Sequence, residues 1–530
     1  MTVSTDLATD HAPTVQADAA GMYAMLARLD LPCYVVRSGG GVGLSHSAPP
    51  GDGLVAVVAP LPPERLGSAA FRSAHGLRYA YMCGAMAGGI ASADLVIATA
   101  RAGALGSFGA AGLLPSVIET ALARFASEIP GLPLAANLIH SPSEDALEAG
   151  AVDLYLRYGI RCVEASAFMD LTRHVVRYRA AGLSTDRQGR VVAANRLIAK
   201  VSRAEVAAKF LGPAPRAILD DLVARGQLTA EQGRLAASVP MADDITMESD
   251  SGGHTDRRPL GAVLPTILAL RDAGQVEHRW VHPVRVGAAG GIGTPSAVTG
   301  ALAMGADYVV TGSVNQACVE ADTSAITRAL LAGAGVADCQ MAPAADMFEM
   351  GVELQVLRKG TLFPMRAKRL LELYRTYDGI EAIPAAERAK LEAQVFRRPI
   401  EDVWADVVEY FTRRDPGQLE RAAAEPRRRM ALIFRWYLGM ASRWAVTGEA
   451  DRAQDYQIWC GPAMGSFNDW VRGTYLEDPD NRRVADVAVH LLRGAAFNAR
   501  VWQLRLAGVR LPAACSTYRP VPLGDAAEVT

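Results

Sequence analysis

The chain has 530 residues, of which 50% are hydrophobic and 21% are charged, and its formal net charge is −2. This length exceeds one ordinary domain and accommodates a barrel of about 250 residues plus a second hydrophobic core. The near-neutral charge gives no bulk attraction to nucleic acid or to an anionic membrane, so neither is expected as a partner. The composition predicts a globular protein with two principal domains.

The seven cysteines are scattered and include no C-x-x-C pair. Without such spacing, the sequence predicts no zinc site, iron–sulfur cluster or dithiol redox site, and no other metal site is expected. We interpret the cysteines as reduced, mostly buried thiols of a cytoplasmic protein. Asp6 and Asp10 lie where an export signal needs basic residues followed by an apolar core, so the N-terminus is not expected to direct export.

Two segments precede the main domain. Residues 1–20 are small and polar without a hydrophobic period, which predicts disorder. Residues 21–75 are expected to form an N-terminal extension, with a short helix from Met22 to Leu29 and strands from Cys33 to Arg37 and from Leu54 to Ala59.

Residues 76–340 alternate short apolar strands with amphipathic helices. Eight such units predict the α/β class and match a closed parallel (β/α)8 TIM barrel, whereas an open doubly wound sheet would usually need fewer strands. The predicted strands are Arg78–Met82, Ala104–Phe108, Leu134–Leu138, Arg161–Glu164, Leu197–Val201, Ile245–Glu248, Val284–Val286 and Tyr308–Val310.

The alternation is interrupted between the fifth and sixth strands. Residues 203–240 contain an additional helical insertion, in which Thr229 and Gln232 are expected to form a capping box for the last helix. An insertion after a barrel strand lies over the catalytic mouth, so we expect this one to be a lid.

The composition changes after about residue 340. Six of the seven tryptophans lie there, among long helical runs. Residues 341–515 are therefore predicted to form an additional C-terminal helical domain, followed by a tail at residues 516–530. The arginines from Arg427 to Arg429 can dock an acidic protein or form a solvated helix face, and the second interpretation is favoured.

The stretch from Val284 to Gln316 carries the strongest ligand-binding signal. Small residues allow backbone N–H groups to approach a phosphate, and a following helix adds its positive N-terminal end. GIGTPS departs from the Rossmann fingerprint, whereas barrel enzymes often hold phosphate with the loops after strands 7 and 8. One alternative for this stretch is a tight turn that binds no ligand. A membrane span is the other alternative, and it fits poorly because residues 286–306 contain six glycines and Pro295. The small residues after the two strands are Gly290, Gly291, Gly293, Gly312 and Ser313.

Other useful residues of a barrel enzyme lie just after the remaining strands, at the C-terminal face. The small apolar residues after the first strand are suited to lie under a flat ring, and they include Ala85, Met86 and Ala87. Asn137 lies at the end of the third strand and carries an amide that both donates and accepts hydrogen bonds.

Lys200 lies within the fifth strand. It either stabilises negative charge that gathers on a reduced cofactor ring or forms an ion pair inside the barrel, with Glu164 or Glu248 as partner.

His254 is the best acid/base candidate. It follows the sixth strand, and the preceding Gly252 and Gly253 would bring it close to a ligand. The alternative is a surface-loop histidine without a role.

Together these motifs resemble a known family. GAMAGG, SDSGGHTD, GAAGGIG and TGSVNQ are similar to the flavin-binding barrel family of nitronate monooxygenases and FMN-dependent enoyl reductases. AANRLIAKVSR, TGSVNQACVEADTS, MFEMGVELQVLRKGTLFPMRA and IWCGPAMGSFNDW look like the PfaD-type branch, the trans-acting enoyl reductases of polyunsaturated fatty acid and trans-acyltransferase polyketide synthases. The resemblance extends from about Leu31 to Pro512.

The resemblance implies reduction, with NADPH and FMN, of the α,β-double bond of enoyl thioesters bound to an acyl carrier protein. Oxidation of alkyl nitronates and a non-catalytic role in synthase assembly are the alternatives, and a homodimer is an open option. Asp250 and Ser251 stand where the broader family commonly reads E-A, so the role of that glutamate is not transferred to Asp250. The implied FMN contacts are the phosphate at Gly290, Gly291, Gly293, Gly312 and Ser313, the ring at Ala85, Met86, Ala87, Asn137 and Lys200, and the site lining at Gly252 and Gly253 beside His254.

Overall fold

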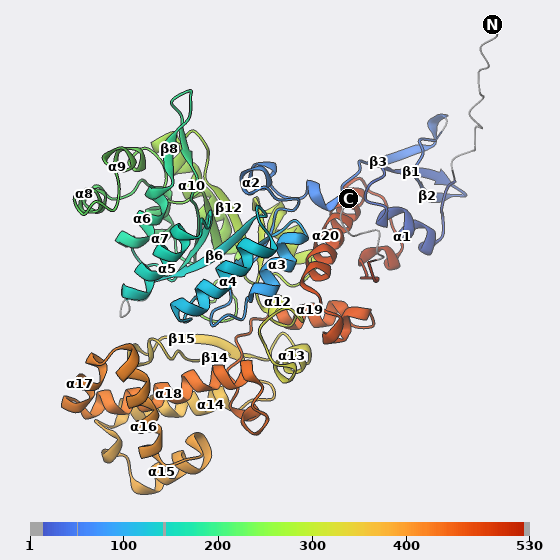
Figure 1. Ribbon diagram of the computed structural model, residues 1–530. Coiled ribbons are helices and arrows are strands. Elements are labelled where there is room, and N and C mark those ends of the chain that lie inside the picture. Colours follow the sequence, from blue (N-terminus) through green and yellow to red (C-terminus); the bar gives the residue numbers. More distant parts are fainter. Residues whose placement is uncertain (1–13, 50, 141–144, 524–530) are drawn as a thin grey trace.

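Eight parallel strands close into a barrel in the computed structural model, which describes residues 14–49, 51–140 and 145–523 (Figure 1). Every one overlaps a predicted strand, so the predicted α/β class and (β/α)8 barrel are confirmed. Neighbouring strands are hydrogen-bonded in the order β10-β11-β12-β13-β4-β5-β6-β7. Their bounds are β4 (Tyr81–Cys83), β5 (Leu105–Phe108), β6 (Leu134–Ile139), β7 (Cys162–Ser166), β10 (Arg196–Val201), β11 (Asp244–Glu248), β12 (Arg285–Ala289) and β13 (Val309–Thr311).

Helices follow the strands and form the outer ring. Ser92, Thr172 and Thr294 each accept a backbone N–H bond at the N-terminus of a helix, as their small polar side chains predict. The helices of the ring are α3 (Ala93–Arg101), α4 (Pro115–Glu128), α5 (Asp145–Arg157), α6 (Arg173–Ala181), α7 (Ala204–Leu211), α10 (Leu260–His278) and α11 (Pro295–Ala303). The next two helices, α12 (Ser313–Gln316) and α13 (Ala325–Ala332), contact helices of the C-terminal part.

A buried ion cluster closes the end of the barrel at which the strands begin. Asp244, the first residue of β11, lies 2.8 Å from His75 Nε2 and accepts a 2.6 Å bond from Arg285 Nε. His75 ends helix α2 (Ala69–His75), whose Phe71 ring stacks on Tyr308 at 4.0 Å. This end is therefore filled, and the opposite end remains for a ligand.

The predicted helical insertion is present. However, the expectation that residues 203–240 form a lid over the mouth of the barrel is wrong. Helix α7 takes the ordinary place of the fifth barrel helix, beside α10, and α8 (Arg216–Ala224) and α9 (Ala230–Ala236) follow it and pack on α6. Met241 N–H returns to Gly212 O, so the insertion starts and ends at the C-terminus of α7. Helix α9 also contacts the hairpin β8 (Leu183–Thr185) and β9 (Val191–Ala193), so the insertion lies along the outer wall.

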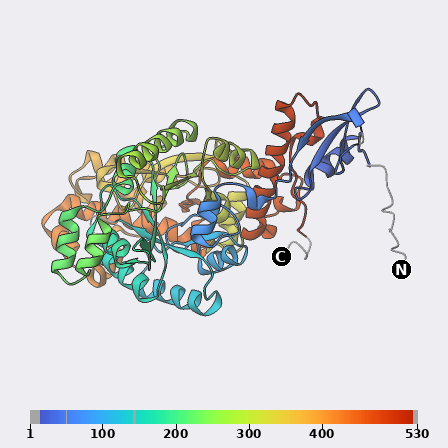
Figure 2. The ribbon, with the colours of Figure 1, turned by 90° about the horizontal axis from the view of Figure 1, so that it is seen from above.

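The N-terminal extension is a small sheet covered by helices from both chain ends. Its strands β1 (Cys33–Ser38), β2 (Gly41–Ser45) and β3 (Leu54–Val58) have the order β2-β1-β3, with α1 (Ala19–Ala27) and α20 (Val484–Leu506) packed alongside. Figures 1 and 2 both show this unit projecting from one side of the barrel.

Order begins earlier than the predicted disorder of residues 1–20. Residues 1–13 lie outside the described part, but Gln16 forms a bridge with Leu44 and Asp18 caps α1. The fully buried Arg500 of α20 donates to Arg28 O and Leu31 O at 2.8 Å each. The contacts of Gln16 and Arg500 join segments that are distant in sequence, and they hold the N-terminal extension in place.

The C-terminal part is not exclusively helical and occupies two places. It starts with an antiparallel hairpin, β14 (Cys339–Pro343) and β15 (Glu353–Leu357), and a helical unit then lies below the barrel in Figure 1. Helix α20 returns to the N-terminal sheet, and Tyr518 of the predicted tail is buried; residues 524–530 lie outside the described part. The remaining helices are α14 (Phe363–Thr376), α15 (Ala385–Lys390), a π-helix (Leu391–Phe396), α16 (Ile400–Arg414), α17 (Gly417–Ala424), α18 (Pro426–Thr447) and α19 (Ala463–Val471).

The arginine cluster at the start of α18 makes ion pairs within the helical unit. Arg428 pairs with Glu349, and Arg429 pairs with Glu381 and with Glu401 at 2.9 Å. Arg428 and Arg429 thus pair with acidic residues of the protein itself, in place of the solvated helix face expected from the sequence. Docking of an acidic protein stays a prediction.

Across the described ranges, no helix combines the length and the apolar character needed to cross a membrane.

Candidate active site

The two predicted phosphate loops lie side by side at the open end of the barrel. Strands β12 and β13 pair through Ala288 with Val309 and through Ala289 with Val310, so the loops that follow them are neighbours. A Cβ added at Gly291 or at Gly312 would meet no atom within 4 Å. The structure therefore brings two unobstructed backbone segments together, as phosphate binding requires.

Gly290 has a structural role that differs from that of Gly291. Its φ is +84°, and an added Cβ would lie 2.6 Å from Ser249 Oγ. Only glycine adopts this conformation without strain and also fits this close approach between the loops after β11 and β12.

Gly293 and Ser313 contact the C-terminal part of the chain. An added Cβ at Gly293 would lie 2.1 Å from Ala463 O, and Gly461 N–H donates to Ser313 Oγ over 3.0 Å. Sequence reasoning assigned both residues to a phosphate and missed this contact, because no local pattern links them to a segment about 150 residues later. The segment from Gly461 to Ala463 thus reaches the outer side of both loops.

Three charged side chains gather inside the barrel near this end. Lys200 Nζ lies 3.5 Å from Glu248 Oε1, which is the ion pair considered as the alternative for Lys200. Burial lowers the pKa of Lys200, but Glu248 and Glu164 outweigh burial and leave the pKa above its ordinary value. Lys200 is therefore a fixed positive charge at neutral pH.

Glu164 is fully buried, and only one of its two carboxylate oxygens has a hydrogen-bond partner among the described residues. Ala85 N–H donates to its Oε2 over 2.9 Å, while Oε1 has no hydrogen-bond partner among the described residues. A buried carboxylate oxygen without a partner is costly, so this atom is suited to accept a bond from a bound polar ring or a water.

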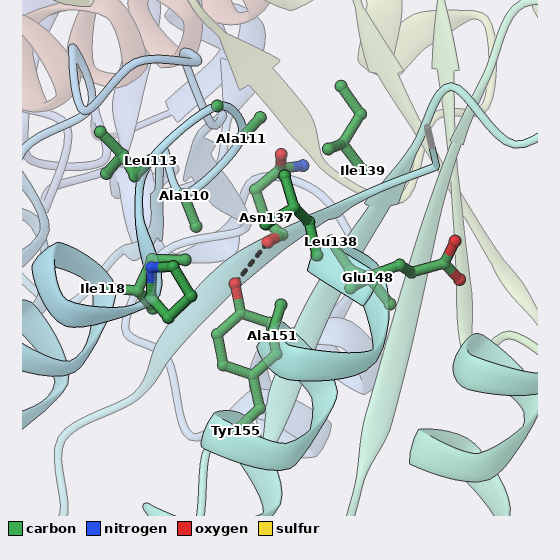
Figure 3. A pocket seen from close by; sticks show the side chains of 13 residues that line it. Ala110, Ala111, Leu113, Ile118, Asn137, Leu138, Ile139, Glu148, Ala151 and Tyr155 are labelled. Carbon is green, nitrogen blue, oxygen red and sulfur yellow. Dashed lines mark hydrogen bonds between the residues drawn. The ribbon is translucent and has the colours of Figure 1, made fainter. Parts of the chain in front are cut away.

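Asn137 is held by the neighbouring strand. Its Nδ2 donates to Glu164 O over 3.0 Å and to Ser166 Oγ over 2.9 Å, which fixes the orientation of the amide. Asn137 also lines a largely apolar cavity between the helices α4 and α5, together with side chains such as Leu138, Ile139 and Tyr155 (Figure 3).

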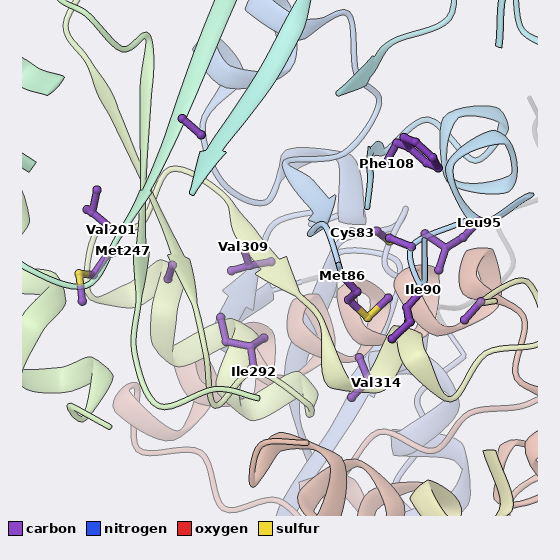
Figure 4. Close-up of a cluster of buried hydrophobic side chains, with 14 of the residues drawn as sticks. Cys83, Met86, Ile90, Leu95, Phe108, Val201, Met247, Ile292, Val309 and Val314 are labelled. Atoms are coloured by element: carbon purple, nitrogen blue, oxygen red, sulfur yellow. The ribbon is translucent and has the colours of Figure 1, made fainter. Parts of the chain in front are cut away.

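Met86 differs from its two neighbours in the loop after β4. Its side chain is 9% exposed and lies in the apolar cluster that includes Cys83 and Ile90 (Figure 4). Ala85 and Ala87 are partly exposed. The backbone and the two alanines are thus the parts of this loop that a ring can contact, while the Met86 side chain packs in the apolar cluster.

The loop that carries His254 is joined to strand β15. Gly253 N–H donates to Gln355 O over 2.9 Å, and Gln355 N–H donates to Gly253 O over 2.7 Å. Gln355 Nε2 also donates to Asp250 Oδ1 over 2.9 Å, so Asp250 has a structural partner here. His254 Nε2 lies 3.4 Å from Asp346 Oδ1, in the connection between β14 and β15.

Sequence reasoning missed Gln355 and Asp346 as parts of the site. Both belong to the stretch from Met347 to Ala367 or directly precede it, and that stretch was noted only as part of a resemblance. Neither residue follows a barrel strand, which was the signal used to select candidates. The site is therefore completed by the first hairpin of the C-terminal part.

Comparisons with known proteins agree with this architecture. The nitronate monooxygenase family profile matches residues 76–367, the PfaD N-terminal domain of fatty acid synthases matches residues 12–63, and the inserted helical domain of [acyl-carrier-protein] S-malonyltransferase matches residues 377–456. The first covers the barrel and the β14–β15 hairpin.

Several relatives are similar over most of this chain. A polyunsaturated fatty acid synthase polypeptide of Thraustochytrium sp. is 46% identical over 91% of the chain and 32% of its own length. The polyketide biosynthesis protein PksE of Bacillus subtilis is 44% identical over 82% of the chain and 56% of its own length. The chain thus spans about a third of the first relative's length and somewhat more than half of the second's.

A solved structure is also similar. The enoyl reductase domain of MlnA, from the macrolactin biosynthesis cluster of Bacillus amyloliquefaciens, superimposes with a TM-score of 0.80 at 38% identity, and the match covers 84% of this chain and 100% of that one. The chain belongs to the nitronate monooxygenase family of barrel proteins. Within that family it belongs to the PfaD-type branch, with enoyl reductase-like domains in polyunsaturated fatty acid and polyketide synthases.

Proposed function

We propose that this protein is an FMN-dependent enoyl reductase that uses NADPH to reduce the α,β-double bond of enoyl thioesters carried by an acyl carrier protein. The observation that carries the proposal is the pair of unobstructed glycine loops after β12 and β13, at the same end of the barrel as Lys200 and His254. The similarity to the enoyl reductase domain of MlnA supports the same reaction class.

The described residues fit an FMN. The open backbone at Gly291 and Gly312 offers N–H groups for the phosphate, and Glu164 Oε1 offers a buried acceptor for a polar edge of the ring. Lys200 supplies a positive charge that stabilises negative charge on the reduced ring. When bound, FMN supplies hydride to the β-carbon of the substrate, which is chemistry that the protein side chains cannot perform.

His254 supplies or orients the proton for the α-carbon. Asp346 Oδ1 lies 3.4 Å from its Nε2 and can hold the imidazole in position. Water is the other candidate donor, with His254 then holding it in place. The remaining tasks of the protein are to position the thioester and to exclude other acceptors.

An anaerobic reoxidation experiment tests this proposal. The protein is reconstituted with FMN, reduced with one equivalent of NADPH and mixed with a crotonyl thioester, and the return of the oxidised-flavin absorbance is followed. We expect rapid return with the thioester and no return with the saturated butyryl thioester. Equal rates with both, or no return with either, would overturn the proposed reaction.

Oxidation of alkyl nitronates is the second candidate, because the matched barrel profile is named for nitronate monooxygenases. Oxygen consumption with a nitronate, measured beside NADPH consumption with the crotonyl thioester, separates the two reactions. The carrier protein as partner is supported by the similarity of residues 377–456 to a domain of an acyl-carrier-protein acyltransferase. A protein that binds its synthase but takes up no FMN would instead be an assembly factor.

A further inference from the structure

Two cysteines that are 121 residues apart in the sequence meet beside the candidate site. The Sγ atoms of Cys339, the first residue of β14, and Cys460 are 3.8 Å apart. Both are free thiols, and Cys460 is fully buried while Cys339 is partly exposed. Cys339 is therefore the more accessible residue of the pair.

Cys460 lies in the segment that touches the loops of the candidate site. An added Cβ at Gly252 would lie 2.9 Å from Cys460 N, so the His254 loop packs directly on this residue. The next residue, Gly461, donates its N–H to Ser313 Oγ over 3.0 Å. A displacement of Cys460 is thus transmitted directly to Gly252 and, through Gly461, to Ser313.

The two thiols differ in reactivity. Hydrogen bonding with Cys460 lowers the pKa of Cys339, against the opposing effects of burial and of Asp250 and Asp338. The hydrogen bond with Cys339 and then burial raise the pKa of Cys460. The thiolate is the nucleophilic form, so the partly exposed Cys339 is the thiol that reacts first, and Cys460 is placed to react second.

We propose that Cys339 and Cys460 form a reversible disulfide, a modification site that controls how tightly the candidate site binds its cofactor. The oxidant is a peroxide. The Cys339 thiolate attacks the O–O bond of hydrogen peroxide, takes one oxygen to become a sulfenic acid, and releases hydroxide, which becomes water on protonation. Cys460 then loses its proton, attacks the sulfenic sulfur and displaces the second water. Two thiols and one peroxide give one disulfide and two waters, and a dithiol reverses the reaction by exchange.

Disulfide formation requires movement at the site. The sulfur atoms must approach from 3.8 Å to a bond length of about 2.05 Å. Cys339 is fixed in the β14–β15 hairpin, and Cys460 N–H is itself held by Gln355 O of β15 over 3.4 Å. The approach of the two sulfur atoms therefore strains the segment from Cys460 to Gly461, and we expect the bond from Gly461 to Ser313 to weaken. The expected effect is a weaker hold on FMN, and this second step rests on the proposed function.

The disulfide itself is tested without any activity measurement. The full chain is treated with hydrogen peroxide, remaining thiols are alkylated, and the digest is analysed by mass spectrometry with and without a reductant. We expect a reductant-sensitive link between the Cys339 and Cys460 peptides, and a loss of two titratable thiols. The link should be absent in Cys339→Ser and present in the matched control Cys515→Ser, whose buried thiol lies in the N-terminal unit.

Two outcomes overturn the modification site: an unchanged thiol count in the wild-type protein, or oxidation of Cys339 that stops at sulfinic acid without a link. The wild-type mapping decides this even where a variant fails to fold. FMN affinity, measured by quenching of flavin fluorescence, tests the second step, and we expect about tenfold weaker binding after oxidation, as for loss of one hydrogen bond near a charged group. Unchanged affinity of the linked protein would overturn the control of cofactor binding alone. No FMN binding in either redox state, with the link present, would overturn the proposed function and leave the disulfide standing.

Discussion

His254 and Asp346 face each other at the mouth of the barrel, with Nε2 and Oδ1 3.4 Å apart. His254 belongs to the loop after β11, and Asp346 belongs to the connection between β14 and β15. Burial raises the pKa of Asp346, but the hydrogen bond and charge of His254 outweigh burial and leave the pKa below its ordinary value. The acid/base candidate of the barrel thus has its carboxylate partner in the C-terminal part of the chain.

Replacement of Asp346 by asparagine tests this pairing. The amide keeps the shape and removes the negative charge 3.4 Å from His254 Nε2, so the imidazole loses its charged partner. We expect kcat/KM for enoyl reduction to drop about tenfold at neutral pH. FMN content should be unchanged, and Asp272→Asn on the exposed side of α10 is the matched control. An unchanged kcat/KM would separate Asp346 from the reaction.

Replacement of His254 by alanine tests the proton donor. The proposed FMN contacts do not include this side chain, so the variant should bind FMN normally and should be reduced by NADPH at the normal rate. Reoxidation by an enoyl thioester should slow by about 100-fold, which is the ordinary contribution of a general acid. The matched control is His278→Ala, at the C-terminus of α10. Unchanged reoxidation would remove His254 from the mechanism and leave water as donor.

Two glycine-to-alanine variants separate binding from folding. At Gly312 an added methyl group meets no atom within 4 Å and φ is negative, at −133°, so Gly312→Ala should fold and should bind FMN at least about tenfold more weakly. At Gly290 the φ of +84° and the 2.6 Å approach to Ser249 predict a loss of about 1–3 kcal/mol in the free energy of unfolding. Urea unfolding of both apoproteins and FMN titrations check the contrast. Equal effects on stability would contradict it.

The closed end of the barrel predicts a stability effect with a defined pH dependence. Burial raises the pKa of Asp244, but His75 and Arg285 outweigh burial and hold it below its ordinary value. The stabilisation from Asp244 is therefore complete above its unfolded-state pKa of about 3.9 and is lost as the pH falls through the lower folded-state pKa. Asp244→Asn leaves Arg285 buried without its partner and should cost about 3–5 kcal/mol at neutral pH.

Urea unfolding between neutral and acidic pH measures this effect, with the surface variant Asp221→Asn as control. The difference between wild type and Asp244→Asn should be constant above about pH 4 and shrink at lower pH. A difference that grows toward acidic pH would show that the carboxylate is not stabilised as the folded-state contacts indicate.

Local sequence patterns were sufficient for the barrel. The alternation of apolar strands and helices predicted each strand, and the glycines from Gly290 to Gly293 marked the loop that joins β12 to α11. These features depend on neighbours in the sequence, since hydrophobic period, caps and positive φ values are local properties. The same reasoning placed Lys200 within the fifth strand and His254 after the sixth.

Contacts between distant segments were not predictable in this way. Asp346, Gln355 and Cys460 reach the site from a hairpin and a returning segment whose own sequence patterns say nothing about the barrel. The position of the insertion was missed for a related reason. The inserted helices follow α7 and not β10 directly, so they emerge at the end of the barrel where the strands begin. The pattern of hydrophobic residues does not distinguish an insertion after the strand from an insertion after the helix.

The visible absorption spectrum of the purified protein tests the central claim most directly. We predict the bands of oxidised flavin, bleached by NADPH and restored anaerobically by a crotonyl thioester. A colourless protein that takes up no FMN on reconstitution would contradict the account.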